Sequence, residues 1–163
     1  MLESGEIAKN KYLRYNALLD EILWMRISDY KIAMLYKDLV QGFTLYSEEG
    51  KKQKVYKKTI VPDFVYLGSI FLEVLAEGKY SLYCYRRIDM IPTKYELYPD
   101  FQYYLKMDED YIHISLRRSS VFKAFSDEEK TKIKSIIRSN RLKIKKNETD
   151  LIRLIVLLNR TSN

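Results

Sequence analysis

The chain of 163 residues contains one histidine, His113, and one cysteine, Cys84. These two side-chain types carry out most nucleophilic, general-base and transition-metal chemistry near neutral pH. A catalytic triad would have to use His113, and a structural zinc site would need carboxylates for most of its ligands. The sequence also contains no glycine-rich loop of the kind that cradles phosphates. We therefore expect no catalytic residue, no cofactor and no metal site.

Each candidate reactive residue has a structural explanation in its sequence context. His113 alternates with isoleucines in a predicted strand, where it needs only a hydrogen bond at the wet face of a sheet. Cys84 lies between two tyrosines in an apolar strand, which is typical of a buried, inert thiol. The acidic run 108–110 lacks the glycine and the spaced ligands of a calcium loop, so we expect a solvated hairpin tip there.

The chain is rich in tyrosine, with fifteen copies that all precede residue 112. Because strands favour tyrosine, β propensity alone explains most of them. An exposed group of tyrosines would instead stack on sugars or bases, or contact another protein. Tyr83 and Tyr85 precede the basic pair Arg86 and Arg87. We predict that these four residues are an exposed site that binds a protein partner or a glycan.

The net charge of +7 is concentrated in one segment, residues 117–146, which holds eleven Lys and Arg against three acidic residues. That segment is therefore +8, and the rest of the chain is −1. Phosphate binding by such a segment would weaken steeply with salt. No RNA-binding aromatic motif or GxxG loop accompanies it, and a solvated lysine-rich face is the simpler explanation. The candidate polyanion-binding residues are Lys134, Arg138, Arg141, Lys143, Lys145 and Lys146.

The elements that must position these residues fall into two regions. Residues 5–116 carry apolar residues at a period of two between turns, which predicts antiparallel strands. The clearest hairpins are expected at 66–88, with strands at 70–75 and 80–85 and a turn at Gly78, and at 101–116. Residues 18–25 also fit a helical period, so a helix is the alternative there. Shorter strands are expected at 12–15, 21–26, 31–36, 40–46 and 54–61.

Helical spacing dominates the C-terminal region, which contains no proline and no glycine. The sequence Ser126-Asp127-Glu128-Glu129 is a capping box that predicts a helix up to Asn140. Asn147 or Thr149 is expected to cap a last helix, and a short helix is expected at 120–125. We predict one α+β domain over residues 1–163. Its antiparallel twisted sheet or open barrel of six to nine strands spans 5–116, and two or three basic helices span 117–160.

Three parts of the chain have a familiar layout. They are the strand entry YNALLDEILW at 15–24, the hairpin FLEVLAEGK at 71–79, and a tail with segments at 103–106, 122–125, 141–144 and 150–152. This layout resembles a family of mostly exported, β-rich proteins of Gram-negative bacteria that have no assigned activity. The resemblance implies a β-rich body, a C-terminal helical lid, and export to the periplasm or the cell surface.

The longest apolar run, 154–158, is far shorter than the roughly 20 residues that cross a bilayer, so we expect no transmembrane segment. The first six residues lack the basic and apolar regions of an export signal. We therefore expect either a mature periplasmic or secreted protein, or a cytoplasmic one. The leading prediction is a non-catalytic binding or structural module of the cell envelope. The alternatives are a cytosolic module that binds nucleic acid or another polyanion through 117–146, and an enzyme that uses carboxylates or His113.

Overall fold

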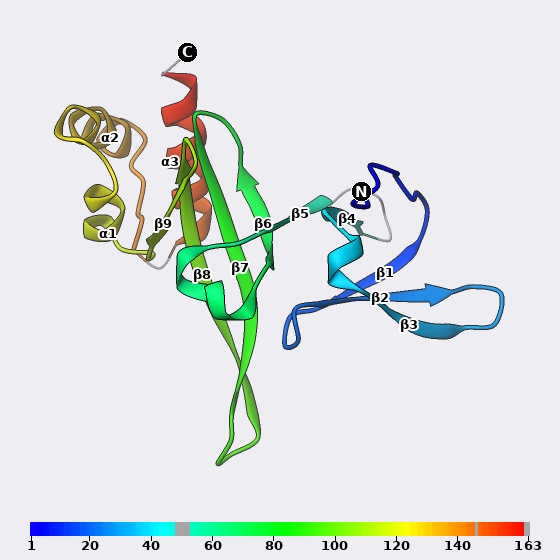
Figure 1. Cartoon of the computed structure of the whole chain (residues 1–163). Coiled ribbons are helices and arrows are strands. Elements are labelled where there is room, and N and C mark those ends of the chain that lie inside the picture. Colours follow the sequence, from blue (N-terminus) through cyan, green and yellow to red (C-terminus); the bar gives the residue numbers. More distant parts are fainter. Residues whose placement is uncertain (48–52, 146, 162–163) are drawn as a thin grey trace. The chain divides into compact units, whose positions relative to one another are not determined.

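The computed structural model describes residues 1–47, 53–145 and 147–161 (Figure 1). These residues form nine strands in two sheets, followed by three α-helices. The predicted α+β class with antiparallel sheets is therefore confirmed. No helix among the described residues is long and apolar enough to cross a membrane.

By their internal contacts the residues divide into two compact units. The N-terminal unit comprises residues 1–73 and 85–101, and the C-terminal unit comprises residues 74–84 and 102–163. The division does not follow the change from strands to helices near residue 116, because the C-terminal unit also contains strand residues.

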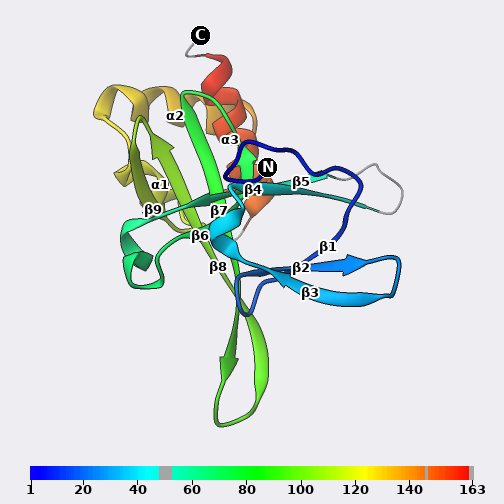
Figure 2. The ribbon, with the colours of Figure 1, turned by 45° about the vertical axis from the view of Figure 1, so that its right-hand side comes forward.

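The first sheet lies in the N-terminal unit and has the order β1–β2–β3 (Figure 2). Asn16 closes its first turn, because its side-chain oxygen accepts a hydrogen bond of 3.1 Å from the backbone N–H of Leu18. Residues 18–25, all of them described, are turn and strand, so strand is the correct choice over helix. The strands are β1 (Tyr12–Asn16), β2 (Glu21–Arg26) and β3 (Lys31–Leu35).

The second sheet is a meander in which each strand pairs with the next along the chain, from β4 to β9. Gly42 is required in β4, because a Cβ there would lie 2.5 Å from the backbone oxygen of Tyr56 on β5. Short 3-10 helices at Lys37–Leu39 and Pro62–Leu67 precede β4 and β6. The strands are β4 (Gly42–Tyr46), β5 (Gln53–Thr59), β6 (Ile70–Ala76), β7 (Tyr80–Ile91), β8 (Glu96–Met107) and β9 (Asp110–Ile114).

The strands β7 and β8 are longer than the sequence predicted. β7 continues to Ile91, and β8 begins at Glu96 instead of at residue 101. The difference arises at Pro99, because proline lacks the N–H that a strand ladder uses and therefore argues against a strand in the sequence. The connecting turn ends at Tyr95, which has a φ of +55° and donates a backbone hydrogen bond of 2.8 Å to Ile91.

The core of the N-terminal unit is small and aromatic. Phe43 and Tyr56 stack with ring centroids 4.6 Å apart, and Phe71 meets the Phe43 ring edge-on at 5.1 Å. Aromatic pairs in these geometries add to the free energy gained from burial alone. Ile22 and Val40 complete this buried cluster.

The helices belong to the C-terminal unit and are α1 (Arg118–Lys123), α2 (Asp127–Ser139) and α3 (Glu148–Arg160). The predicted capping box is present, because Ser126 accepts from the Glu129 N–H and Glu129 accepts from the Ser126 N–H. Asn147, one of the two predicted caps of α3, accepts from the Asp150 N–H at 3.1 Å. The apolar stripes of α2 and α3 join residues of β7 and β8 in one buried cluster.

Candidate functional site

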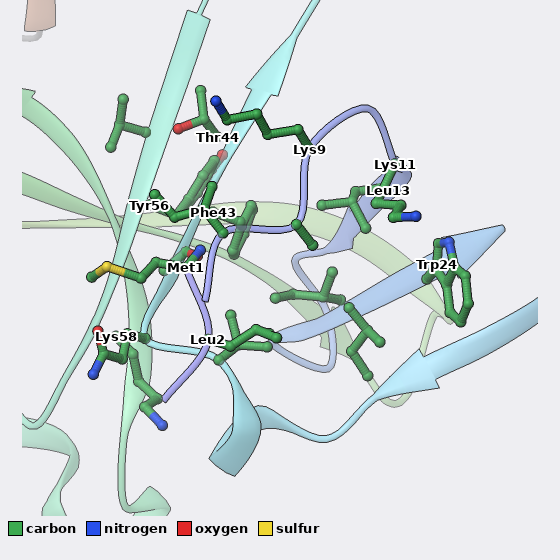
Figure 3. Close-up of a pocket in the computed structure, with 18 of the residues that line it drawn as sticks. Met1, Leu2, Lys9, Lys11, Leu13, Trp24, Phe43, Thr44, Tyr56 and Lys58 are labelled. Atoms are coloured by element: carbon green, nitrogen blue, oxygen red, sulfur yellow. The ribbon is translucent and has the colours of Figure 1, made fainter. Parts of the chain in front are cut away.

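The N-terminal unit contains a pocket of about 970 Å³ with a mainly apolar lining (Figure 3). Its walls are the first sheet, the strands β4 and β5, and the N-terminal segment 1–11. Ligand pockets in proteins typically have volumes of roughly 300–1,000 Å³ and apolar walls with a few polar groups. The size and lining of this pocket therefore suit a small molecule.

The register of the first sheet decides which side chains line the pocket. Leu13 lies opposite Trp24, and Tyr15 lies opposite Ile22. Since alternate residues of a strand share a face, these four side chains lie on one face of the sheet. Leu13, Ile22 and Trp24 line the pocket, whereas Tyr15 packs into the aromatic core. Trp24 is the only tryptophan of the chain.

The strands β4 and β5 supply a rigid aromatic wall. Phe43 and Tyr56 line the pocket and are both buried. Tyr15 supports them, with its ring centroid 5.0 Å from that of Tyr56. Because these rings pack against one another on several sides, the wall presents apolar surface to a ligand with little freedom to rearrange.

Lysines are the main charged residues of the pocket. Of the residues that the structure describes, Lys9, Lys11, Lys57 and Lys58 line it, against one carboxylate, Glu3. Lys58 and Glu3 form an ion pair of 2.6 Å, and this contact lowers the pKa of the Glu3 carboxyl below its usual value. Lys9 and Lys11 form no ion pair with any residue that the structure describes. Figure 3 shows the Lys9 side chain extending toward Thr44 on β4.

Hydrogen bonds hold the first residues of the N-terminal segment in the wall of the pocket. Leu2 forms an antiparallel bridge with Val40, and the Glu3 N–H donates to the Leu39 carbonyl at 3.0 Å. The Gln41 side chain donates to the Glu3 carboxylate at 3.2 Å. These contacts fix Leu2 and Glu3 as part of the wall.

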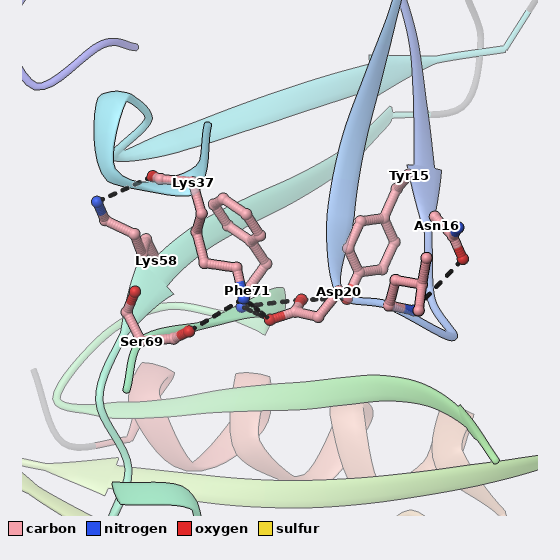
Figure 4. Close-up of polar contacts among 8 residues, drawn as sticks. Tyr15, Asn16, Asp20, Lys37, Lys58, Ser69 and Phe71 are labelled. Carbon is pink, nitrogen blue, oxygen red and sulfur yellow. Dashed lines mark hydrogen bonds and ion pairs between the residues drawn. The ribbon is translucent and has the colours of Figure 1, made fainter. Parts of the chain in front are cut away.

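A buried carboxylate lies elsewhere in the same unit (Figure 4). Asp20 accepts hydrogen bonds from the Tyr15 hydroxyl and from the Lys37 ammonium, both at 2.6 Å, and from the Phe71 N–H at 3.3 Å. Lys37 also donates to the Ser69 carbonyl at 3.2 Å. Burial raises the pKa of Asp20, and the hydrogen bonds from Lys37 and Tyr15 oppose that shift. Because these partners occupy both carboxylate oxygens, Asp20 holds the turn before β2 in place and is not arranged for proton transfer.

The prediction that Tyr83 and Tyr85 are an exposed pair is wrong. Their exposed fractions are 6% and 3%. The Tyr83 ring packs against Tyr111 with centroids 5.7 Å apart, and the Tyr85 ring packs edge-on against Phe64 at 5.2 Å. Both faces of β7 are covered, so neither ring offers a surface on which a sugar could stack.

The two arginines predicted beside them have protein partners. Arg86 forms an ion pair of 2.5 Å with the buried Glu73 and lies over the Phe101 ring. Arg87 pairs with Asp89 at 3.0 Å. These contacts give both guanidinium groups a structural role.

The predicted polyanion-binding residues do reach the surface. Lys134 and Arg138 are exposed on α2, and Arg141, Lys143 and Lys145 are exposed on the connector to α3. Exposed and buried residues alternate along this connector, because Leu142 and Ile144, which lie between the cations, are buried. Lys146 lies outside the described residues.

The remaining candidates have the environments of structural or surface residues. Cys84 is fully buried, and His113 is exposed beside the Tyr104 ring at 5.4 Å. The acids 108–110 are an exposed hairpin tip, where Glu109 pairs with Lys106. Among the residues that the structure describes, no three His, Cys, Asp or Glu side chains are grouped so that they could hold a metal ion.

Sequence reasoning did not find the pocket. Leu13, Trp24, Phe43 and Tyr56 come from four strands, and each has the apolar character of an ordinary core residue. Only the isolated lysines Lys9 and Lys11, just before an apolar strand, give a local sign of a charged rim. No protein-family model, curated protein or solved structure matches this chain.

Proposed function

We propose that this chain is a non-catalytic binding module whose ligand is an amphipathic anion. The observation that carries the proposal is the apolar pocket of the N-terminal unit with Lys9 and Lys11 at its edge. An apolar body would gain about 25 cal/mol for each Å² of its surface that the pocket removes from water. An anionic head at the two lysines would keep its charge in contact with water and with a counter-charge.

The first test uses dodecanoate, whose chain and carboxylate match this description, and reads the fluorescence of Trp24. A saturable change in Trp24 emission is expected, with weaker binding of dodecanol because it lacks the charge. The double variant Lys9→Gln/Lys11→Gln should weaken dodecanoate binding about five- to tenfold and leave dodecanol binding unchanged.

The matched control is Lys31→Gln/Lys94→Gln, which removes the same charge from exposed lysines of the same unit that do not line the pocket. A further variant, Thr44→Phe, places a large side chain in the pocket and should abolish binding of both ligands. If dodecanoate and dodecanol leave the Trp24 emission unchanged up to their solubility limits, the proposal is wrong.

A second candidate function is polyanion binding by the C-terminal unit. It is favoured by the five exposed cations between Lys134 and Lys145. Charge reversal at Lys134, Arg138 and Arg141 should abolish retention on heparin and leave the melting temperature nearly unchanged, because all three side chains are exposed. Retention of the variant at the salt concentration of the wild type would exclude this surface.

We also propose, from the family resemblance alone, that the protein works in the cell envelope, in the periplasm or on the cell surface. Fractionation of cells that produce the protein from its own gene would test this. Recovery in the cytoplasmic fraction alone would contradict it.

A further inference from the structure

A second hollow lies in the C-terminal unit and is lined by Leu116, Arg117, Arg118, Ser119 and Lys145. Three of these five residues are cations, and a fourth carries a hydroxyl. The hollow is separate from the first pocket, which is lined by residues 1–58 only. It also does not include Lys134, Arg138 or Arg141 of the polyanion surface.

The fold brings these residues together from two distant segments. β9 ends at Ile114, and the chain then turns tightly into α1, where the Arg117 N–H donates to the Ser115 carbonyl at 2.6 Å. The Ser120 hydroxyl accepts from the Ser115 N–H at 3.0 Å and fixes the same turn. The turn therefore holds Arg117 and Arg118 in a defined position at the start of α1.

Lys145 reaches the hollow from the connector between α2 and α3. The connector is anchored because Ile144 is buried and because the Lys143 N–H donates to the Asp150 carboxylate at 2.8 Å. The alternation of buried and exposed residues then places Lys145 on the exposed side.

Within the described part of the chain, the charges of the cations in the hollow are not neutralised. No carboxylate in the described part of the chain forms an ion pair with Arg117, Arg118 or Lys145. The Arg118 guanidinium lies over the Phe122 ring, 5.1 Å from its centroid, and this cation–π contact restricts its position. The Ser119 hydroxyl has no hydrogen-bond partner among the described residues.

We propose that this hollow binds the phosphate group of a small phosphate monoester. Guanidinium groups match the oxygens of phosphate in a bidentate geometry, and a lysine adds a compact positive charge. A serine hydroxyl supplies one further donor. The hollow has a volume of about 490 Å³, so it admits the phosphate together with part of the molecule that carries it. This inference is independent of the ligand of the first pocket.

The test measures binding of inorganic phosphate and of phenyl phosphate by calorimetry at low salt. Millimolar or tighter binding with one-to-one stoichiometry is expected for both. The variant Arg117→Gln/Lys145→Gln should weaken it at least tenfold, and Arg118→Lys should weaken it severalfold because the fork geometry is lost while the charge remains.

The matched control is Lys123→Gln/Arg153→Gln, which removes two exposed cations of the same unit from outside the hollow and should change affinity less than twofold. Circular dichroism and the melting temperature of each variant show whether it is folded. Equal weakening by the control pair would mean that diffuse charge, and not this hollow, attracts phosphate, and would overturn the proposal. So would the absence of phosphate binding by the wild type when a single-stranded oligonucleotide binds, because that result would assign the cations to a polymer.

Discussion

Asp20 shows how a carboxylate can be buried without being a reactive group. Its oxygens are occupied by Tyr15, Lys37 and the Phe71 N–H, which come from three separate parts of the N-terminal unit. The residue has a φ of +53°, a conformation that aspartate tolerates better than most residues. Its side chain and its backbone therefore both serve the turn between β1 and β2.

We expect Asp20→Asn to lower the free energy of unfolding by about 2 kcal/mol, because the half-buried Lys37 ammonium loses its counter-charge. Urea denaturation at neutral pH measures this change. Asp29→Asn is the control, since it removes a carboxylate that pairs with Arg26 at the surface, and its effect should be much smaller. Equal effects of the two substitutions would show that burial of the Asp20 pair is unimportant.

The buried tyrosines predict how stability depends on alkaline pH. Burial raises the pKa of Tyr85 to about 12, from an ordinary value of 10.0. Burial, together with Asp20, also raises the pKa of Tyr15. The unfolded chain releases these protons first, so the stability they contribute is complete below pH 10 and is lost as the pH rises toward 12.

The urea midpoint should therefore fall between pH 10 and pH 12, and Tyr85→Phe should reduce the slope of that fall. Tyr95→Phe is the control, because that side chain is exposed and should leave the slope unchanged. A Tyr85→Phe variant with the slope of the wild type would contradict the assignment.

At the scale of elements, α3 is tied to the β6–β7 hairpin through one side chain. Asn159 accepts from the Tyr80 N–H at 2.9 Å and donates to the Tyr80 carbonyl at 2.8 Å. A Cβ on Gly78 would lie 2.5 Å from the Asn159 side chain, and Gly78 has a φ of +156°. The glycine is therefore needed both for the turn and for the space that Asn159 fills.

Both Gly78→Ala and Asn159→Ala should destabilise the protein, by about 1 to 2 kcal/mol each. Because an alanine at position 78 must displace Asn159, the double variant should cost less than the sum of the two, by roughly 1 kcal/mol. Urea denaturation of the wild type, the two single variants and the double variant measures the coupling free energy between positions 78 and 159. Additive losses would mean that the strain at position 78 is independent of Asn159.

The elements themselves were largely predictable from the sequence, and the candidate site was not. Ser126 and Glu129 predict α2, and alternating side chains predict β9, because these signals act between near neighbours. The burial of Tyr83 depends on Tyr111, which approaches only in the folded chain. The apolar pocket likewise needs five strands and the N-terminal segment to come together, and no local sequence pattern encodes that arrangement.

At the scale of the whole molecule, charge and exposed apolar surface are segregated. Among the described residues, every large apolar side chain that is exposed belongs to the N-terminal unit. The C-terminal unit holds fifteen Lys and Arg against nine acidic residues, a formal charge of +6, which leaves +1 for the N-terminal unit. Solubility should therefore depend on repulsion between basic C-terminal units.

Light scattering should then increase as the pH approaches the isoelectric point of about 9.3, where the net charge of the whole protein is zero. Ile32→Lys on the edge strand β3 should raise the protein concentration at which scattering begins, since Ile32 is 67% exposed. Ser28→Lys adds the same charge on the adjacent turn and is the control. If both variants have the same effect, net charge alone controls association.

The single buried thiol allows the opening of β7 to be followed by thiol labelling. Cys84 has no exposed surface, and the chain contains no other cysteine that a labelling reagent could attack. A thiol reagent can therefore modify the native protein only when β7 opens, so the labelling rate reports the frequency of that opening. The motion of the strand at the centre of the meander can thus be timed in the unaltered protein, with one label and at one known position.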